Sequence, residues 1–160
     1  MKRIGLITFV FILIYSYIPA LDLAKKEPPV TLTLSTPQKL RAGQTGKARI
    51  DVQIRKPWHL FSQSPEIQGV RPTKFALQPS GSVAVEKIEY STPKAVHSPV
   101  FNKDLALYED AMTITLTLKI SASQSGKIPL EGTFEYQACS DTSCLPPAKQ
   151  PFSATLEVVP

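Results

Sequence analysis

Hydrophobic and polar residues alternate with a period of two along much of the chain after residue 30. The alternation is clearest in Met112–Ile120, where Thr115 and Thr117 would face solvent and every second residue would face a core. A period of two predicts β-strands buried on one face. Longer strands are predicted at Val30–Ser35, Ala48–Ile54, Ser82–Tyr90 (less regular), Met112–Ile120, Ile128–Tyr136 and Phe152–Val158, with shorter ones at Trp58–Ser62, Lys74–Leu77 and Leu105–Tyr108.

The breaks between these segments carry turn residues. Polar clusters with glycine occur at residues 41–44, 79–82 and 123–126, and the chain has 15 prolines against 7 glycines. No stretch has the pattern of an amphipathic helix of about ten or more residues. About eight strands at this spacing predict an all-β fold, an immunoglobulin-like two-sheet antiparallel sandwich.

The first twenty residues have the composition of an export signal. Lys2 and Arg3 precede an almost wholly apolar run from Ile4 to Ala20. We therefore expect a signal peptide at 1–20, a short tether at 21–29 and one domain at 30–160. The expected location is the periplasm, with an uncleaved N-terminal membrane anchor as the alternative.

The charge excludes some functions. The chain has 18 basic and 13 acidic residues, and Lys2 and Arg3 belong to the expected signal. The basic residues that remain are few and scattered, whereas nucleic-acid binding needs clustered Lys and Arg.

No serine, aspartate or glutamate stands in a nucleophile–base order that would indicate a hydrolase.

The two cysteines are the most informative residues. Cys139 follows a predicted strand, and Cys144 precedes a double proline and another strand, so the pair would lie at a hairpin end. Outside the cytoplasm, a pair of cysteines can be oxidised to a disulfide. Closing a loop of about six residues stabilises a fold by only about 2 kcal/mol, against about 4.7 kcal/mol for a loop of about 100 residues. A redox pair and a structural hairpin bridge both remain open on spacing alone.

Metal binding is a third interpretation. His59, His97, Met112 and the cysteines include ligands for a soft ion such as Cu(I). Nothing in the sequence brings them together, and Met112 falls on the core face of its strand. We therefore expect neither a metal nor a cofactor.

The stretch Tyr136-Gln137-Ala138-Cys139 with Cys144-Leu145-Pro146-Pro147 resembles the active-site segment of the N-terminal periplasmic domain of the thiol:disulfide interchange protein DsbD, a family also described as disulfide bond corrector-like. Phe101 to Asp110 is similar to the cap loop of that family and the strand after it. The run Trp58-His59-Leu60-Phe61 is similar to an aromatic strand near its active site. The resemblance covers roughly residues 30–158.

This resemblance implies an immunoglobulin-like protein thiol-disulfide oxidoreductase that carries electrons outside the membrane. It implies that Cys144 forms a mixed disulfide with the partner and that Cys139 resolves it. It implies that Phe101 shields the bond, with His59, Phe61 and Tyr136 around the site. The implied partners are a membrane electron-conduit protein and thioredoxin-fold periplasmic proteins, including those of cytochrome c maturation, rather than a small-molecule substrate or nucleic acid.

The chain also departs from the family pattern. Pro99 and Val100 stand where the enterobacterial form has acidic residues, and His59 and Phe61 stand where better-known members have tyrosines. Phe101 could also be a loop aromatic packed on the core. The alternative function is a non-catalytic exported binding or assembly domain with a structural disulfide.

Overall fold

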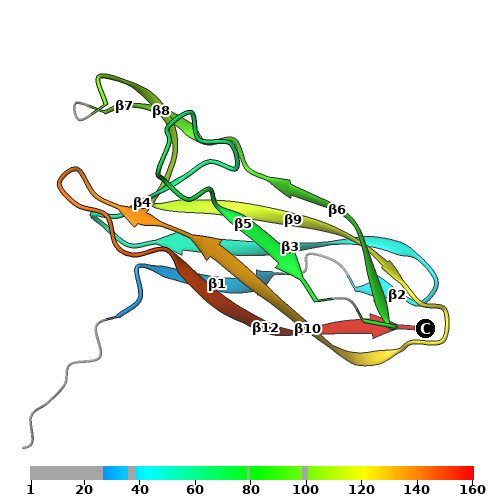
Figure 1. Cartoon of the computed structure of the whole chain (residues 1–160). Coiled ribbons are helices and arrows are strands. Elements are labelled where there is room, and N and C mark those ends of the chain that lie inside the picture. The colour runs from blue at the N-terminus through cyan, green and yellow to red at the C-terminus, as the bar shows by residue number, and fades with distance from the viewer. Residues whose placement is uncertain (1–26, 36–38, 79, 99–100) are drawn as a thin grey trace, which may run out of the picture.

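The computed structural model describes residues 27–35, 39–78, 80–98 and 101–160, whose strands form two four-stranded sheets and a third sheet at one end (Figure 1). The expected signal peptide, residues 1–20, lies outside the described residues. The expected tether, residues 21–29, is described only from residue 27. In the part of the chain that is described, no helix is long and apolar enough to span a membrane.

The first sheet is antiparallel and contains the most regular of the predicted strands. Its order is β1 (Val30–Ser35), β3 (Thr45–Ile54), β9 (Ala111–Ile120) and β6 (Val83–Tyr90). In β6 the register shifts between Val85 and Lys87. A bulge adds one residue to a strand, so side chains beyond it exchange faces. This explains why the alternation in β6 is the least regular of the longer strands.

The second sheet has the order β2 (Leu40–Arg41), β12 (Ala148–Val159), β10 (Gly126–Tyr136) and β5 (Lys74–Leu77). β10 and β12 form a long antiparallel hairpin, while the short strand β2 runs parallel to β12. Gly132 allows β10 and β5 to approach closely, because a Cβ there would lie 2.7 Å from the carbonyl oxygen of Ala76.

One hydrophobic core fills the space between these sheets. Its largest fully buried side chains come from both sheets, including Ile50, Ile114, Leu116, Leu130, Phe134 and Leu156. They occupy alternate positions along β3, β9, β10 and β12, as the period of two predicts. Full burial of such a side chain stabilises the fold by about 1.5–3 kcal/mol. The predicted all-β, immunoglobulin-like sandwich is confirmed.

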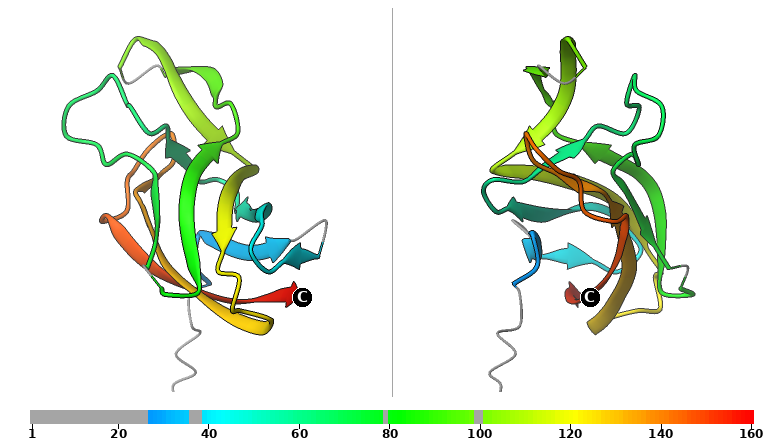
Figure 2. Two further views of the ribbon diagram at one scale, coloured as in Figure 1. Left: turned by 90° about the vertical axis from the view of Figure 1, so that its right-hand side faces the viewer. Right: turned by 60° about the vertical axis from the view of Figure 1, so that its left-hand side comes forward.

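The third sheet combines strands at two of the predicted short segments, Trp58–Ser62 and Leu105–Tyr108, with two strands that were not predicted. Its order is β11 (Ala138–Cys139), β4 (His59–Phe61), β8 (Lys103–Glu109) and β7 (Lys94–Ser98). The hairpin of β7 and β8 projects beyond the two larger sheets (Figure 2). β7 lacks a strand signal in the sequence because it is an edge strand, and Lys94, Ala95 and His97 are exposed on it.

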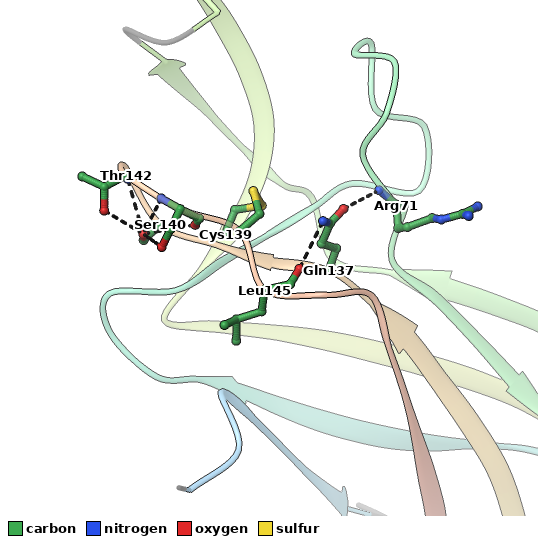
Figure 3. Close-up of a disulfide and its surroundings, with 8 residues drawn as sticks. Arg71, Gln137, Cys139, Ser140, Thr142 and Leu145 are labelled. Carbon is green, nitrogen blue, oxygen red and sulfur yellow. Dashed lines mark hydrogen bonds between the residues drawn. A yellow bond between two sulfur atoms is a disulfide. The ribbon is translucent and has the colours of Figure 1, made fainter.

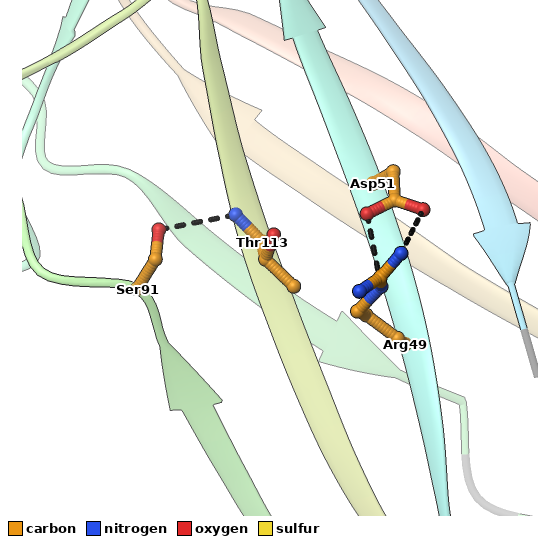
Figure 4. A network of polar contacts seen from close by, with 4 residues as sticks. All are labelled: Arg49, Asp51, Ser91 and Thr113. Atoms are coloured by element: carbon orange, nitrogen blue, oxygen red, sulfur yellow. Dashed lines mark hydrogen bonds and ion pairs between the residues drawn. The ribbon is translucent and has the colours of Figure 1, made fainter. Parts of the chain in front are cut away.

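Figure 4 shows two polar contacts of the first sheet. Arg49 and Asp51, two positions apart on β3, form an ion pair with a 3.1 Å contact. Just after β6, Ser91 Oγ accepts a hydrogen bond from the backbone N–H of Thr113 at 3.1 Å. An exposed ion pair contributes about 0–1 kcal/mol, so the buried side chains dominate the stability of this sheet.

Candidate functional site

The third sheet has two different faces, and this difference creates the site. Leu60, Tyr108 and Ala138 pack into the main core. The residues next to them in sequence point the other way, and Phe61, Leu107 and Cys139 are buried in a second, smaller hydrophobic cluster with Leu105. Alternation across a strand thus separates the core from a second apolar surface.

Cys139 and Cys144 are joined by a disulfide in the loop between β10 and β12, and their Cα atoms lie 4.0 Å apart. The predicted position at a hairpin end is therefore observed. The two residues differ sharply in exposure. Cys139 is only 2% exposed, because β11 pairs with β4 and places it in the second cluster. Cys144 is exposed.

The turn between the cysteines is organised by Ser140 (Figure 3). The backbone N–H of Ser140 donates to the carbonyl oxygen of Ser143 at 2.7 Å. Ser140 Oγ accepts hydrogen bonds from the backbone N–H groups of Thr142 at 3.4 Å and Ser143 at 3.2 Å. Side-chain-to-backbone bonds of this kind hold a turn without help from the rest of the fold.

Gln137 fastens the same loop on its other side (Figure 3). Its Nε2 donates to the carbonyl oxygen of Leu145 at 3.2 Å, and its Oε1 accepts from the backbone N–H of Arg71 at 3.0 Å. Arg71 ends a segment whose Ile67 and Val70 pack against the second cluster. One amide side chain therefore connects the disulfide loop to the segment that covers part of the cluster.

A pocket of about 310 Å³ lies over the disulfide. Both cysteines, His59, Phe61 and Phe101 line it, together with Val96, Leu105, Leu107 and Glu109. Sequence reasoning missed these last four residues as part of the site. The apolar alternation in 105–108 was a signal for a strand but not for its position beside the cysteines.

Phe101 lies beside β7 and β8, in the turn that connects them. It is 42% exposed and lines the pocket. The alternative in which Phe101 packs on the core is wrong, because the turn carries it away from the sandwich. Pro99 and Val100 lie outside the described residues.

His59 and Phe61 both line the pocket from β4, and their rings meet edge to face with centroids 6.0 Å apart. His59 is half-buried, and burial lowers its pKa below the ordinary value of 6.5. The carboxylates of Asp141 and Glu109 oppose this effect, since negative charge favours the imidazolium. The balance favours a neutral imidazole at neutral pH.

Tyr136 lies apart from this pocket. Its ring is 4% exposed, belongs to the main core, and packs against Phe134 with centroids 5.3 Å apart. Burial raises the pKa of its phenol. Tyr136 thus supports the strand that leads to Cys139, and it does not share a pocket with the sulfurs.

The metal-ligand candidates do not form a site in the described ranges. No group of three or more His, Cys, Asp and Glu residues there is placed to hold a metal ion. Met112 is 3% exposed and lies in the main core. His97 is exposed, and its Nδ1 lies 3.0 Å from Asp104.

Solved structures with similar folds come from proteins of different kinds. The reduced DsbD N-terminal domain from Neisseria meningitidis is 13% identical, with a TM-score of 0.46 over 72% of this chain and 82% of that one. A family 123 glycoside hydrolase from Clostridium perfringens is 11% identical, with a TM-score of 0.39 over 82% of this chain and 27% of that one. The fimbrial subunit AggA from Escherichia coli is 10% identical, with a TM-score of 0.36 over 82% and 95%.

A search of curated proteins finds no match. The protein-family comparison does find one, with the model described as thiol:disulfide interchange protein DsbD, N-terminal, over residues 30–156. This range includes strands of all three sheets, with β12 up to residue 156, and both cysteines. The chain therefore belongs to the family of DsbD N-terminal domains.

Proposed function

We propose that this chain is a thiol-disulfide exchange module that works through Cys139 and Cys144. Membership of the DsbD N-terminal family supports exchange chemistry. The observation that carries the proposal is the contrast between the two bonded residues, of which Cys144 is exposed and Cys139 is 2% exposed. Thiol-disulfide exchange begins when one accessible sulfur of the protein forms a mixed disulfide with its partner. The second sulfur of the protein then attacks this mixed disulfide and releases the partner.

The reaction has two balanced steps. In the reduced protein, the Cys144 thiolate attacks a partner disulfide, forms a mixed disulfide and releases one partner thiolate. Cys139 then attacks the Cys144 sulfur, forms the Cys139–Cys144 bond and releases the second partner thiolate. Two electrons pass from the module to the partner, and the two protons of the cysteine thiols end on the two partner thiolates. A partner dithiol reduces the module by the reverse sequence.

The pocket supplies the selectivity in this proposal. Exchange needs in-line access to a sulfur. Phe101 lines the pocket above the disulfide from the end of a projecting hairpin, where a docking protein can displace it. Phe61 and His59 form the pocket wall from β4. A small thiol in solution brings no surface that would move the hairpin.

The proposed setting is the periplasm. Residues 1–20 would direct export and 21–29 would tether the domain at 30–160, with an uncleaved anchor as the alternative. The proposed reductant is a membrane electron-conduit protein. The proposed acceptors are oxidised thioredoxin-fold proteins, including those that serve cytochrome c maturation.

Trapping tests this proposal directly. A Cys139→Ala variant cannot resolve a mixed disulfide, so we expect it to accumulate a covalent adduct with a thioredoxin-fold protein through Cys144. Cys144→Ala is the matched control and should accumulate far less adduct. The reduction potential is the second measurement. A value below about −300 mV would indicate a structural bridge in a non-catalytic domain and would overturn the proposal.

A further inference from the structure

Cys139, His59 and Glu109 stand in one row across three neighbouring strands. β11 pairs with β4 so that Cys139 lies opposite His59, and β4 pairs with β8 so that His59 lies opposite Glu109. Directly paired residues of an antiparallel sheet project to the same face with Cβ atoms about 4.5–5.5 Å apart. All three line the pocket over the disulfide.

This row has the order of a nucleophile, a base and a carboxylate whose charge stabilises the protonated base. We propose that His59 accepts the proton of the Cys139 thiol when Cys139 attacks the sulfur of Cys144. This role rests on the exchange function proposed above. The Cys139–Cys144 bond forms, the bond from Cys144 to the partner sulfur breaks, the partner leaves as a thiolate, and the proton remains on the imidazole.

The surroundings of Cys139 explain why it needs a proton acceptor. It is buried beside Phe61, Leu105 and Leu107 in the second cluster. Apolar surroundings disfavour a charged thiolate, although the thiolate is the attacking species. Cys144 is exposed and can lose its proton to water.

The charged groups around His59 favour its role as a proton acceptor. Burial lowers the pKa of His59, so the imidazole is neutral and able to accept a proton at neutral pH. Asp141 from the disulfide loop and Glu109 from β8 favour the imidazolium once it forms. Lys94 of β7 contacts Glu109 at 3.6 Å and weakens that effect in part. His97 of β7 lines the same pocket but lies beside Asp104.

A two-phase oxidation separates this step from the first. Reduced protein mixed with 5,5′-dithiobis(2-nitrobenzoate) should release one aryl thiolate when Cys144 reacts and a second when Cys139 closes the ring. The second phase reports the proposed step. An unassisted thiol with a pKa of about 8.5 is only a few per cent ionised at pH 7. We therefore expect His59→Gln to slow the second phase by about 10- to 30-fold at pH 7 and to leave the first phase nearly unchanged.

The pH profile distinguishes proton transfer from packing. In the wild type, the second phase should already level off below pH 6.5, because burial lowers the pKa of His59 below that ordinary value. In His59→Gln it should still be rising at pH 8.5, the ordinary pKa of a thiol, because the apolar surroundings of Cys139 disfavour its thiolate. Glu109→Gln should move the wild-type inflection to lower pH, since Glu109 raises the pKa of His59. A variant that only disturbed packing would change the rate without moving the profile.

His97→Gln is the matched control, since it removes the other histidine of the same pocket. Equal second-phase profiles for His59→Gln, His97→Gln and the wild type would overturn the inference. That outcome would leave the exchange function intact. A wild-type protein that releases only one aryl thiolate, as Cys139→Ala should, would instead contradict the proposed function.

Discussion

The side-chain oxygen of Gln137 accepts a hydrogen bond from the backbone N–H of Arg71 at 3.0 Å, across 66 positions of sequence. This bond joins the disulfide loop to the segment whose Ile67 and Val70 pack against the second cluster. The same amide also donates to the carbonyl oxygen of Leu145. Two loops that lack regular strand pairing are thereby held in one arrangement.

Replacing Gln137 with leucine should therefore destabilise the site. The variant removes both hydrogen bonds, one at an exposed and one at a part-buried position, and a typical hydrogen bond contributes about 0.5–1.5 kcal/mol. We expect a loss in that range in urea unfolding of the oxidised protein, and faster hydrogen exchange at the Arg71 amide. Gln53→Leu, at an exposed position of β3, is the control. Unchanged exchange at Arg71 would show that the bond is not formed in solution.

Ser140 should tune the reduction potential of the disulfide. Its hydrogen bonds hold the turn, so the reduced cysteines stay close and reform their bond readily. Ser140→Ala should make the disulfide easier to reduce. A loss of about 1 kcal/mol corresponds to a rise in potential of about 20 mV. Equilibration against glutathione measures this value, and Ser123→Ala, in a distant turn, should leave it unchanged.

Phe101 should protect the disulfide from small thiols. Phe101→Ala opens the pocket over the sulfurs, so we expect glutathione to reduce the bond several-fold faster than in the wild type, with little change in the equilibrium potential. Among the described residues, the other large apolar side chain that is exposed is that of Val85, on β6 in the first sheet. Val85→Ala is therefore the control. Equal rates for all three proteins would remove the shielding role.

Gly132 should tolerate an added side chain poorly. An added Cβ would lie 2.7 Å from the carbonyl oxygen of Ala76 and 3.0 Å from the ring of Phe75, so β5 would have to shift. Overpacking of this kind costs about 1–3 kcal/mol. Gly81→Ala meets nothing within 4 Å and should be nearly neutral. Thermal unfolding of the two variants compares them directly.

The sequence predicts the sandwich well because each long strand shows the period-two alternation of apolar and polar residues within its own segment. In β9 every second residue is apolar, and all of these side chains are buried. The position of Cys139 and Cys144 at a hairpin end also follows from local sequence. These features depend on neighbours along the chain, which a single sequence displays.

The third sheet could not be predicted in this way. β11 has only two residues and β7 is an exposed edge strand, so neither shows a period, and the predicted strands at Trp58–Ser62 and Leu105–Tyr108 do not reveal their partners. The pairing of β11 with β4, which places His59 opposite Cys139, depends on how distant parts of the chain meet. The burial of Cys139 and the exposure of Cys144 follow from that pairing. Tyr136 was expected near the sulfurs from its place in the motif, but alternation turns it into the core.

The last strand, β12, separates the C-terminal residue from the disulfide loop. β12 begins at Ala148, beside the disulfide loop, and its 12 residues run about 40 Å away from it. Figure 1 shows the C-terminal residue at the far end of the sandwich. A linker attached after Pro160 could therefore fix the protein to an electrode or sensor chip with its sulfurs facing the solution. Oriented films of this kind would allow electron exchange with docking proteins to be measured electrically.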